Sequence, residues 1–119
     1  MKRLRSLSLA TALLLSAAAM AAAPGYTLLK SMTVGGDTFW DAVTFDGASH
    51  HLFLTHGSHV VVLDSKDYSL AGDIPNVTGA HQVAVGLGKG YATSGTTNSV
   101  IVFDTATLKV TGTIAVGTR

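Results

Sequence analysis

The chain has 119 residues, enough for one small domain, with eight basic residues, seven aspartates and no glutamate. It has no cysteine, which excludes disulfide bonds and thiolate metal sites. Two prolines, thirteen glycines and frequent Thr, Val and Ser favour short strands and turns over helices.

Residues 1–22 are predicted to be a bacterial, Sec-type secretory signal peptide with a helical core. Lys2, Arg3 and Arg5 precede the apolar stretch 7–20, and small residues follow at 19–23. The apolar stretch is too short to span a membrane, so we expect a periplasmic or secreted product with no transmembrane segment. Without the signal, five basic residues face seven aspartates, a net charge of −2, which disfavours generic nucleic-acid binding.

Residues 23–119 are predicted to form a partial all-β domain made of one strand and two four-stranded units. The single strand is expected at 28–34. The first unit, 40–75, is expected to have strands at 40–45, 51–55, 59–64 and 69–74. The second unit, 80–117, is expected to repeat them at 81–85, 90–94, 99–104 and 109–116.

The two units are copies offset by forty residues. The identical pairs are Val60/Val100, Val62/Val102, Asp64/Asp104, Gly72/Gly112 and Ile74/Ile114. One turn in each unit is expected to be longer by one residue than its counterpart, near His50 in the first and at 95–98 in the second. A period of about 40 to 45 residues built from short strands is typical of a β-propeller blade. The apolar runs 60–63 and 100–103 indicate strands covered on both faces.

The segment 28–34 aligns only with the last strand of each unit, because Leu28 matches Tyr68 and Val34 matches Ile74. We therefore expect an orphan outer strand of an incomplete propeller. The chain is interpreted as the N-terminal part of a longer propeller, whose remaining blades would be its partners. Assembly of several short chains into a ring is the alternative.

The second unit resembles the YVTN-type propeller repeat. The resemblance lies in Gly90-Tyr91-Ala92-Thr93-Ser94-Gly95, in the apolar strand 98–104 ending in Asp, and in 107–117, and it extends over about 28–117. The first unit departs from it, with Leu52-Phe53-Leu54-Thr55 in place of the strand that Tyr begins. The resemblance implies an exported, YncE-like, seven-bladed propeller, and similar repeats occur in the haem d1 domain of nitrite reductases. It implies a fold more than a function.

A ligand site is predicted at Trp40, Asp41 and His81. Asp41 and His81 are equivalent in the repeat and precede the innermost strand, near one mouth of a propeller channel, where Trp40 would offer a stacking surface. In the alternative interpretation, Asp41 caps a loop and backbone groups satisfy His81. His56 and His59 frame a tight turn and form a second, metal-binding hypothesis, because imidazole binds Zn, Cu, Ni or Fe. The alternative there is a pair of solvated histidines.

Asp64 and Asp104 end the apolar strands and are predicted to accept N–H bonds from the following turn. No catalytic residue is predicted, and no cofactor is specified. The first functional hypothesis is a scaffold that binds a small molecule or a protein. The alternatives are a redox propeller resembling the haem d1 domain, with His81 as its candidate ligand, and a lactonase-like hydrolase built on Asp41 and His81.

Overall fold

The computed structural model describes residues 25–36 and 39–118. The chain divides into two compact units, Met1–Ser31 and Met32–Arg119, and all strands of the described residues lie in the second unit. The predicted signal peptide, residues 1–22 with its helical core, lies outside the described residues. Within the described ranges, no helix has the length and apolar character needed to cross a membrane.

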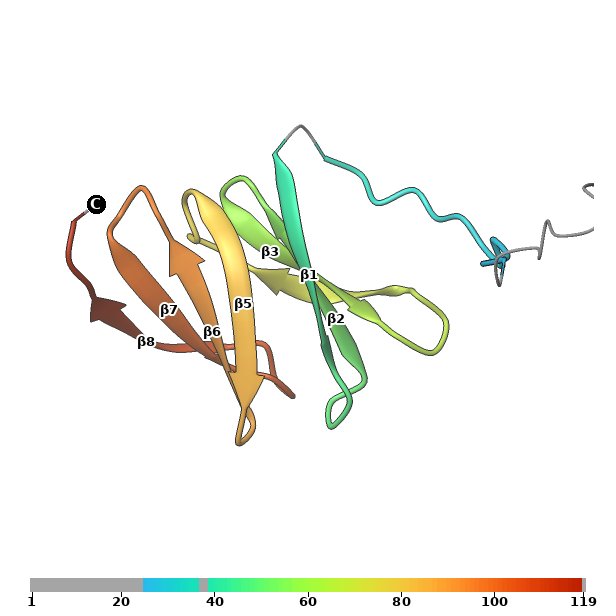
Figure 1. Ribbon diagram of the computed structural model, residues 1–119. Coiled ribbons are helices and arrows are strands. Elements are labelled where there is room, and N and C mark those ends of the chain that lie inside the picture. Colours follow the sequence, from blue (N-terminus) through green and yellow to red (C-terminus); the bar gives the residue numbers. More distant parts are fainter. Residues whose placement is uncertain (1–24, 37–38, 119) are drawn as a thin grey trace, which may run out of the picture. The chain divides into compact units, whose positions relative to one another are not determined.

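Two four-stranded antiparallel sheets make up the fold, and each pairs its strands in sequence order (Figure 1). The first sheet contains β1 (Trp40–Asp46), β2 (His51–His56), β3 (His59–Asp64) and β4 (Leu70–Ile74). The second sheet contains β5 (Ala80–Gly86), β6 (Lys89–Ser94), β7 (Ser99–Asp104) and β8 (Val110–Ala115). For the described residues the all-β prediction is confirmed, as are the eight strands predicted for the two repeat units, with each strand end within one residue of its expected position.

The pairing register corrects the predicted alignment of β2 with β6. Phe53 lies opposite Val62, and Tyr91 lies opposite Val102, so Phe53 and Tyr91 are equivalent. The turn at 47–50 is therefore two residues longer than its counterpart at 87–88, and the turn at 95–98 is two longer than that at 57–58. The expected difference was one residue in each place. An aromatic side chain thus occupies this position in both units, and the first unit departs less from the repeat than its sequence indicated.

The predicted strand over 28–34 is not formed, because residues 25–36 have no regular secondary structure. Tyr26, Leu28 and Leu29 are largely exposed, at 105%, 80% and 92%. A strand requires hydrogen bonds from a neighbouring strand, and no described strand pairs with this segment. The apolar pattern of the segment matched the outer strands, but the pattern alone does not supply a partner.

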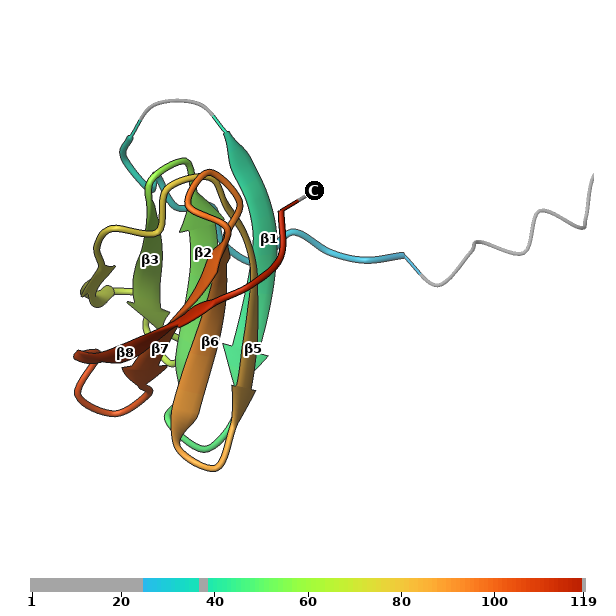
Figure 2. The same cartoon turned by 90° about the vertical axis from the view of Figure 1, so that its left-hand side faces the viewer.

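The core lies between the two sheets. Phe53 packs against Phe103, with ring centroids 5.3 Å apart. Gly90 makes room for this packing, because a Cβ atom there would collide with the Phe103 ring. The other buried core residues are Val60, Val62, Ile74, Val77, Ala80, Val83, Ala92 and Ile101. Figure 1 and Figure 2 both show β1 beside β5, and the Thr44 hydroxyl donates to the Val83 carbonyl across this contact, at 2.7 Å.

The aspartates at the ends of β3 and β7 hold the turns that follow them, as predicted. Asp64 accepts the backbone N–H of Lys66 at 2.7 Å. Asp104 accepts the backbone N–H groups of Ala106 and Thr107 at 3.0 and 2.7 Å. The backbone and then the side-chain hydrogen bond of Thr107 lower the pKa of the Asp104 carboxyl, because both favour its charged form. The repeated aspartates are therefore structural.

Candidate functional site

A groove of about 560 Å³ contains all five residues that the sequence analysis singled out, Trp40, Asp41, His56, His59 and His81. The start of β1, the β2–β3 turn and the start of β5 line it. The residues meet because β1 and β2 are antiparallel, which places Trp40 opposite His56. The predicted ligand site and the predicted metal site are therefore two parts of one groove.

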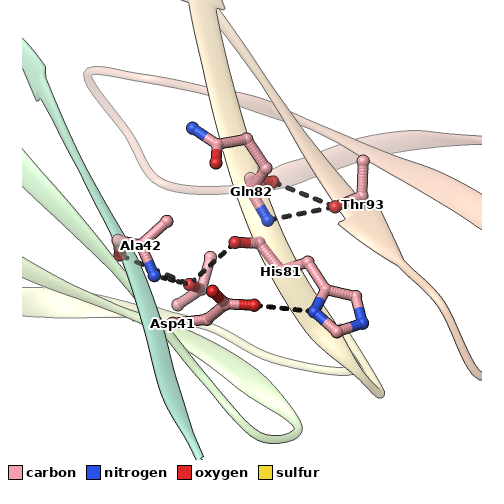
Figure 3. A network of polar contacts seen from close by, with 6 residues as sticks. Asp41, Ala42, His81, Gln82 and Thr93 are labelled. Atoms are coloured by element: carbon pink, nitrogen blue, oxygen red, sulfur yellow. Dashed lines mark hydrogen bonds and ion pairs between the residues drawn. The ribbon is translucent and has the colours of Figure 1, made fainter.

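Asp41 and His81 bind each other across the two sheets. The Nδ1 atom of His81 lies 2.7 Å from Oδ2 of Asp41, and Figure 3 shows the two side chains facing each other between β1 and β5. A carboxylate only accepts hydrogen bonds, so His81 carries a hydrogen on Nδ1. In neutral His81, Nε2 is then an acceptor on the side of the ring away from Asp41. Neither alternative, a loop-capping aspartate or a backbone-satisfied histidine, describes this pair.

Irregular pairing at the start of β1 and β5 aims these side chains. The register shifts between Trp40 and Val43 in the first sheet, and between Ala80 and Val83 in the second. Such bulges redirect a side chain out of the regular alternation of a strand. The forty-residue repeat places one bulge in each sheet, and the packing of β1 beside β5 brings Asp41 and His81 together.

Thr55 connects the two bulges and was missed by the sequence analysis. Its side chain is buried, and its Oγ1 accepts the backbone N–H of Ala42 at 2.8 Å. The same hydroxyl lies 3.2 Å from the His81 carbonyl and 3.3 Å from the Ala42 carbonyl, so it donates to one of them. Its counterpart, Thr93, makes the same local contacts with Gln82 (Figure 3). This recurrence within the repeat was the signal that could have identified Thr55.

Trp40 and His56 form a stacked pair. Their ring centroids are 3.9 Å apart and their planes differ by 10°. His56 is only 4% exposed, whereas Trp40 keeps 41% of its surface in contact with solvent. Stacking on a buried ring fixes the orientation of the indole, so Trp40 offers a pre-positioned aromatic surface at the groove.

His56 and His59 also contact each other, but as a hydrogen-bonded pair. Nδ1 of His56 lies 3.3 Å from Nε2 of His59, which in turn lies 3.6 Å from Oδ1 of Asp73. A direct hydrogen bond uses the lone pair that a metal ion would need. Among residues 25–36 and 39–118, no group of three His, Cys, Asp or Glu residues is arranged to hold a metal. The metal hypothesis therefore remains a sequence prediction.

The backbone before β1 closes over His56. A Cβ atom at Gly36 would collide with the His56 ring, and Gly36 adopts a φ of 126°, which favours glycine. The Nε2 atom of His56 is buried without a hydrogen-bond partner in the described structure. Phe39 has a φ of 72°, which is rare for a bulky residue, and its carbonyl accepts the Gly57 N–H at 3.1 Å. Strain and an unsatisfied buried group are features that cluster at binding sites.

The chain matches no protein-family model and no curated protein. The geometry of the groove and the forty-residue repeat are therefore the features that point to a function.

Proposed function

We propose that this chain is an exported, YncE-like β-propeller protein that acts as a scaffold for binding a small ligand. Two four-stranded antiparallel sheets, related by a forty-residue repeat and packed face to face, support the interpretation of each sheet as a propeller blade. The predicted signal peptide supports export. The ligand site is the groove between the starts of β1 and β5.

The observation that carries the proposal is the convergence of an aromatic surface and a polar pair in one groove. Trp40, stacked on His56, supplies a flat apolar face, and Phe39 beside it is 80% exposed. Asp41 supplies carboxylate oxygens, and His81 supplies Nε2. Pockets of this type combine apolar walls with a few fixed polar groups. They suit a small molecule with a ring face and hydroxyl donors, such as a monosaccharide or another cyclic alcohol.

Intrinsic fluorescence gives a direct test, because Trp40 is the only tryptophan of the chain. Titration with neutral sugars and cyclic alcohols is expected to change Trp40 emission saturably for at least one compound. No change with any compound of this class, together with no heat of binding in calorimetry, would contradict the proposal. Titrating cyclic amines and carboxylates in parallel would show whether the groove prefers a charged ligand, an outcome that rejects this ligand class.

His81→Asn is the variant that tests the role of the polar pair. Asparagine keeps an N–H group that can reach Asp41 but lacks Nε2, so a ligand hydroxyl loses its acceptor. We expect affinity to fall about tenfold, which corresponds to one hydrogen bond of about 1.4 kcal/mol. His50→Asn is the matched control, because His50 is exposed and does not line the groove. Equal affinities of the two variants would exclude His81 from the site.

A lactonase-like hydrolase is the second candidate, and the Asp41–His81 distance of 2.7 Å favours it. A carboxylate that holds Nδ1–H leaves Nε2 free to take a proton from water as a general base. Lactones and simple esters are the substrates to assay. Hydrolysis by the wild-type chain that is lost in His81→Asn and kept in His50→Asn would support this candidate over simple binding.

A further inference from the structure

Each sheet has two faces, and the repeat makes these faces equivalent between the sheets. We name the A-face after the row Val43, Leu54 and Val61 of the first sheet, which corresponds to Val83, Ala92 and Ile101 of the second. We name the B-face after the first-sheet residues Phe53, Val60, Val62 and Ile74, which correspond to Tyr91, Val100, Val102 and Ile114. Residues directly opposite in an antiparallel ladder point to the same side, which defines each row.

Within the chain, the B-face of the first sheet packs against the A-face of the second. The four B-face residues of the first sheet are completely buried, and Phe53 contacts Phe103. The equivalent B-face of the second sheet is open, with Tyr91 36% exposed and Ile114 50% exposed. On the first sheet the A-face is open at its β1 edge, where Val43 is 64% exposed, although Val61 in the central strand β3 is only 7% exposed. Among the described residues, one face of each type is therefore left partly uncovered.

Glycine contacts show the same difference. A Cβ atom at Gly72, on the B-face of the first sheet, would lie 2.6 Å from Cδ1 of Leu108, which comes from the loop before β8. Its counterpart, Gly112, has nothing within 4 Å of such an atom. Tyr68 is the repeat equivalent of Leu108 and is 39% exposed. A second copy of the first sheet would bring its Tyr68 to Gly112, just as Leu108 meets Gly72.

The equivalent residues Thr55 and Thr93 provide independent evidence that the second sheet lacks a neighbour that the first sheet has. Thr55, on the first sheet, has the His81 carbonyl of the second sheet within hydrogen-bond distance, at 3.2 Å. Thr93 makes the same local contacts with Gln82. Among the described residues, however, its hydroxyl makes no hydrogen bond to another sheet. By the repeat, the carbonyl of Asp41 in a second copy is the equivalent partner for Thr93.

We propose that two copies of this chain bind head to tail, with the open A-face of one copy covering the open B-face of the other. This interface would repeat the contact between the two sheets of one chain, because an equivalent A-face is exposed on the first sheet and an equivalent B-face on the second sheet. The interface is heterologous, so each copy keeps one open face and further copies can add. The proposal does not depend on ligand binding in the groove.

Sedimentation velocity of the purified chain tests the association. The mass is expected to exceed that of one chain and to rise with concentration. Val43→Asp places a charge on the open A-face, and Ile114→Asp places one on the open B-face, so each variant alone is expected to be monomeric. Leu87→Asp is the matched control, because Leu87 is fully exposed in the β5–β6 turn and has a φ of 53°, which aspartate tolerates. It should associate like the wild-type chain.

Mixing the two monomeric variants distinguishes a head-to-tail contact from a symmetric one. Val43→Asp keeps an intact B-face and Ile114→Asp keeps an intact A-face, so the mixture is expected to form a dimer that grows no further. A wild-type chain that is monomeric at all concentrations would overturn the proposal. A mixture that stays monomeric would overturn the head-to-tail geometry, provided that circular dichroism shows both variants to be folded β proteins.

Discussion

Replacement of Thr55 by valine isolates the hydrogen bonds that hold the two bulges of the groove together. Valine has nearly the same shape but no hydroxyl, so the packing is kept while the polar contacts are lost. The Ala42 N–H loses an acceptor at 2.8 Å, and the carbonyl that receives the Thr55 hydroxyl hydrogen, His81 at 3.2 Å or Ala42 at 3.3 Å, loses its donor. Because Thr55 is only 1% exposed, water does not readily replace the hydroxyl.

The expected cost of Thr55→Val follows from these contacts. Leaving a buried polar group without a partner costs about 1–3 kcal/mol, so we expect unfolding free energy to fall by about 2 kcal/mol. Urea denaturation, followed by Trp40 fluorescence at one fixed protein concentration, measures this difference. With a typical dependence on urea for a small domain, the midpoint should fall by about 1 M.

The internal repeat provides a matched control in Thr93→Val. Both threonine variants are made in the Val43→Asp background, which is expected to be monomeric, so that no second copy covers Thr93. Thr93 accepts the Gln82 N–H at 3.0 Å in the same local arrangement, but it is exposed, so water can take over the contact. We expect a loss of less than about 0.5 kcal/mol for this variant. Equal losses in the two variants, or a loss below about 0.5 kcal/mol for Thr55→Val, would refute the view that Thr55 joins the bulges across the sheets.

Two further predictions concern the backbone near the groove and the turn after β7. Gly36→Ala should lower stability by about 1 kcal/mol or more and change Trp40 emission, because the added Cβ meets the His56 ring at a strained φ. Gly35→Ala, with nothing within 4 Å, should do neither, and equal effects would contradict the contact. Asp104 has a lowered pKa in the folded chain, so its stabilising effect is complete above its unfolded pKa and is lost as acid protonates it. Acid titration of circular dichroism should therefore show a shallower loss of stability below about pH 4 in Asp104→Asn than in wild type, and identical slopes would contradict this.

The strands could be predicted because their signals are local. The run Val60 to Leu63 is buried at every position, and the aspartate that ends it caps the next turn as its sequence position indicated. The sequence pattern aligned Tyr91 with Leu52, whereas the strand register aligns it with Phe53. The alignment was wrong because register across a turn depends on which residues pair and not on apolar character. The strand at 28–34 failed for a related reason, since a strand requires a partner.

The repeat allowed part of the site to be predicted from the sequence. Asp41 and His81 were selected as equivalent positions, but their 2.7 Å contact depends on two bulges and on sheet packing, which no local pattern encodes. The stack of Trp40 on His56 depends on the pairing of β1 with β2. Gly36 lies before the first strand, and its contact with His56 depends on the path of a segment without regular structure.

NMR of the histidine and tryptophan side chains in the purified chain tests most directly whether these residues form one groove. The structure predicts nuclear Overhauser effects between the Trp40 indole and the His56 imidazole, whose centroids are 3.9 Å apart. It also predicts that neutral His81 carries its hydrogen on Nδ1, held by Asp41. Loss of that tautomer in Asp41→Ala would show that Asp41 holds the hydrogen on Nδ1. Absence of the Trp40–His56 effects, together with a hydrogen on Nε2 of His81 in the wild-type chain, would contradict the account.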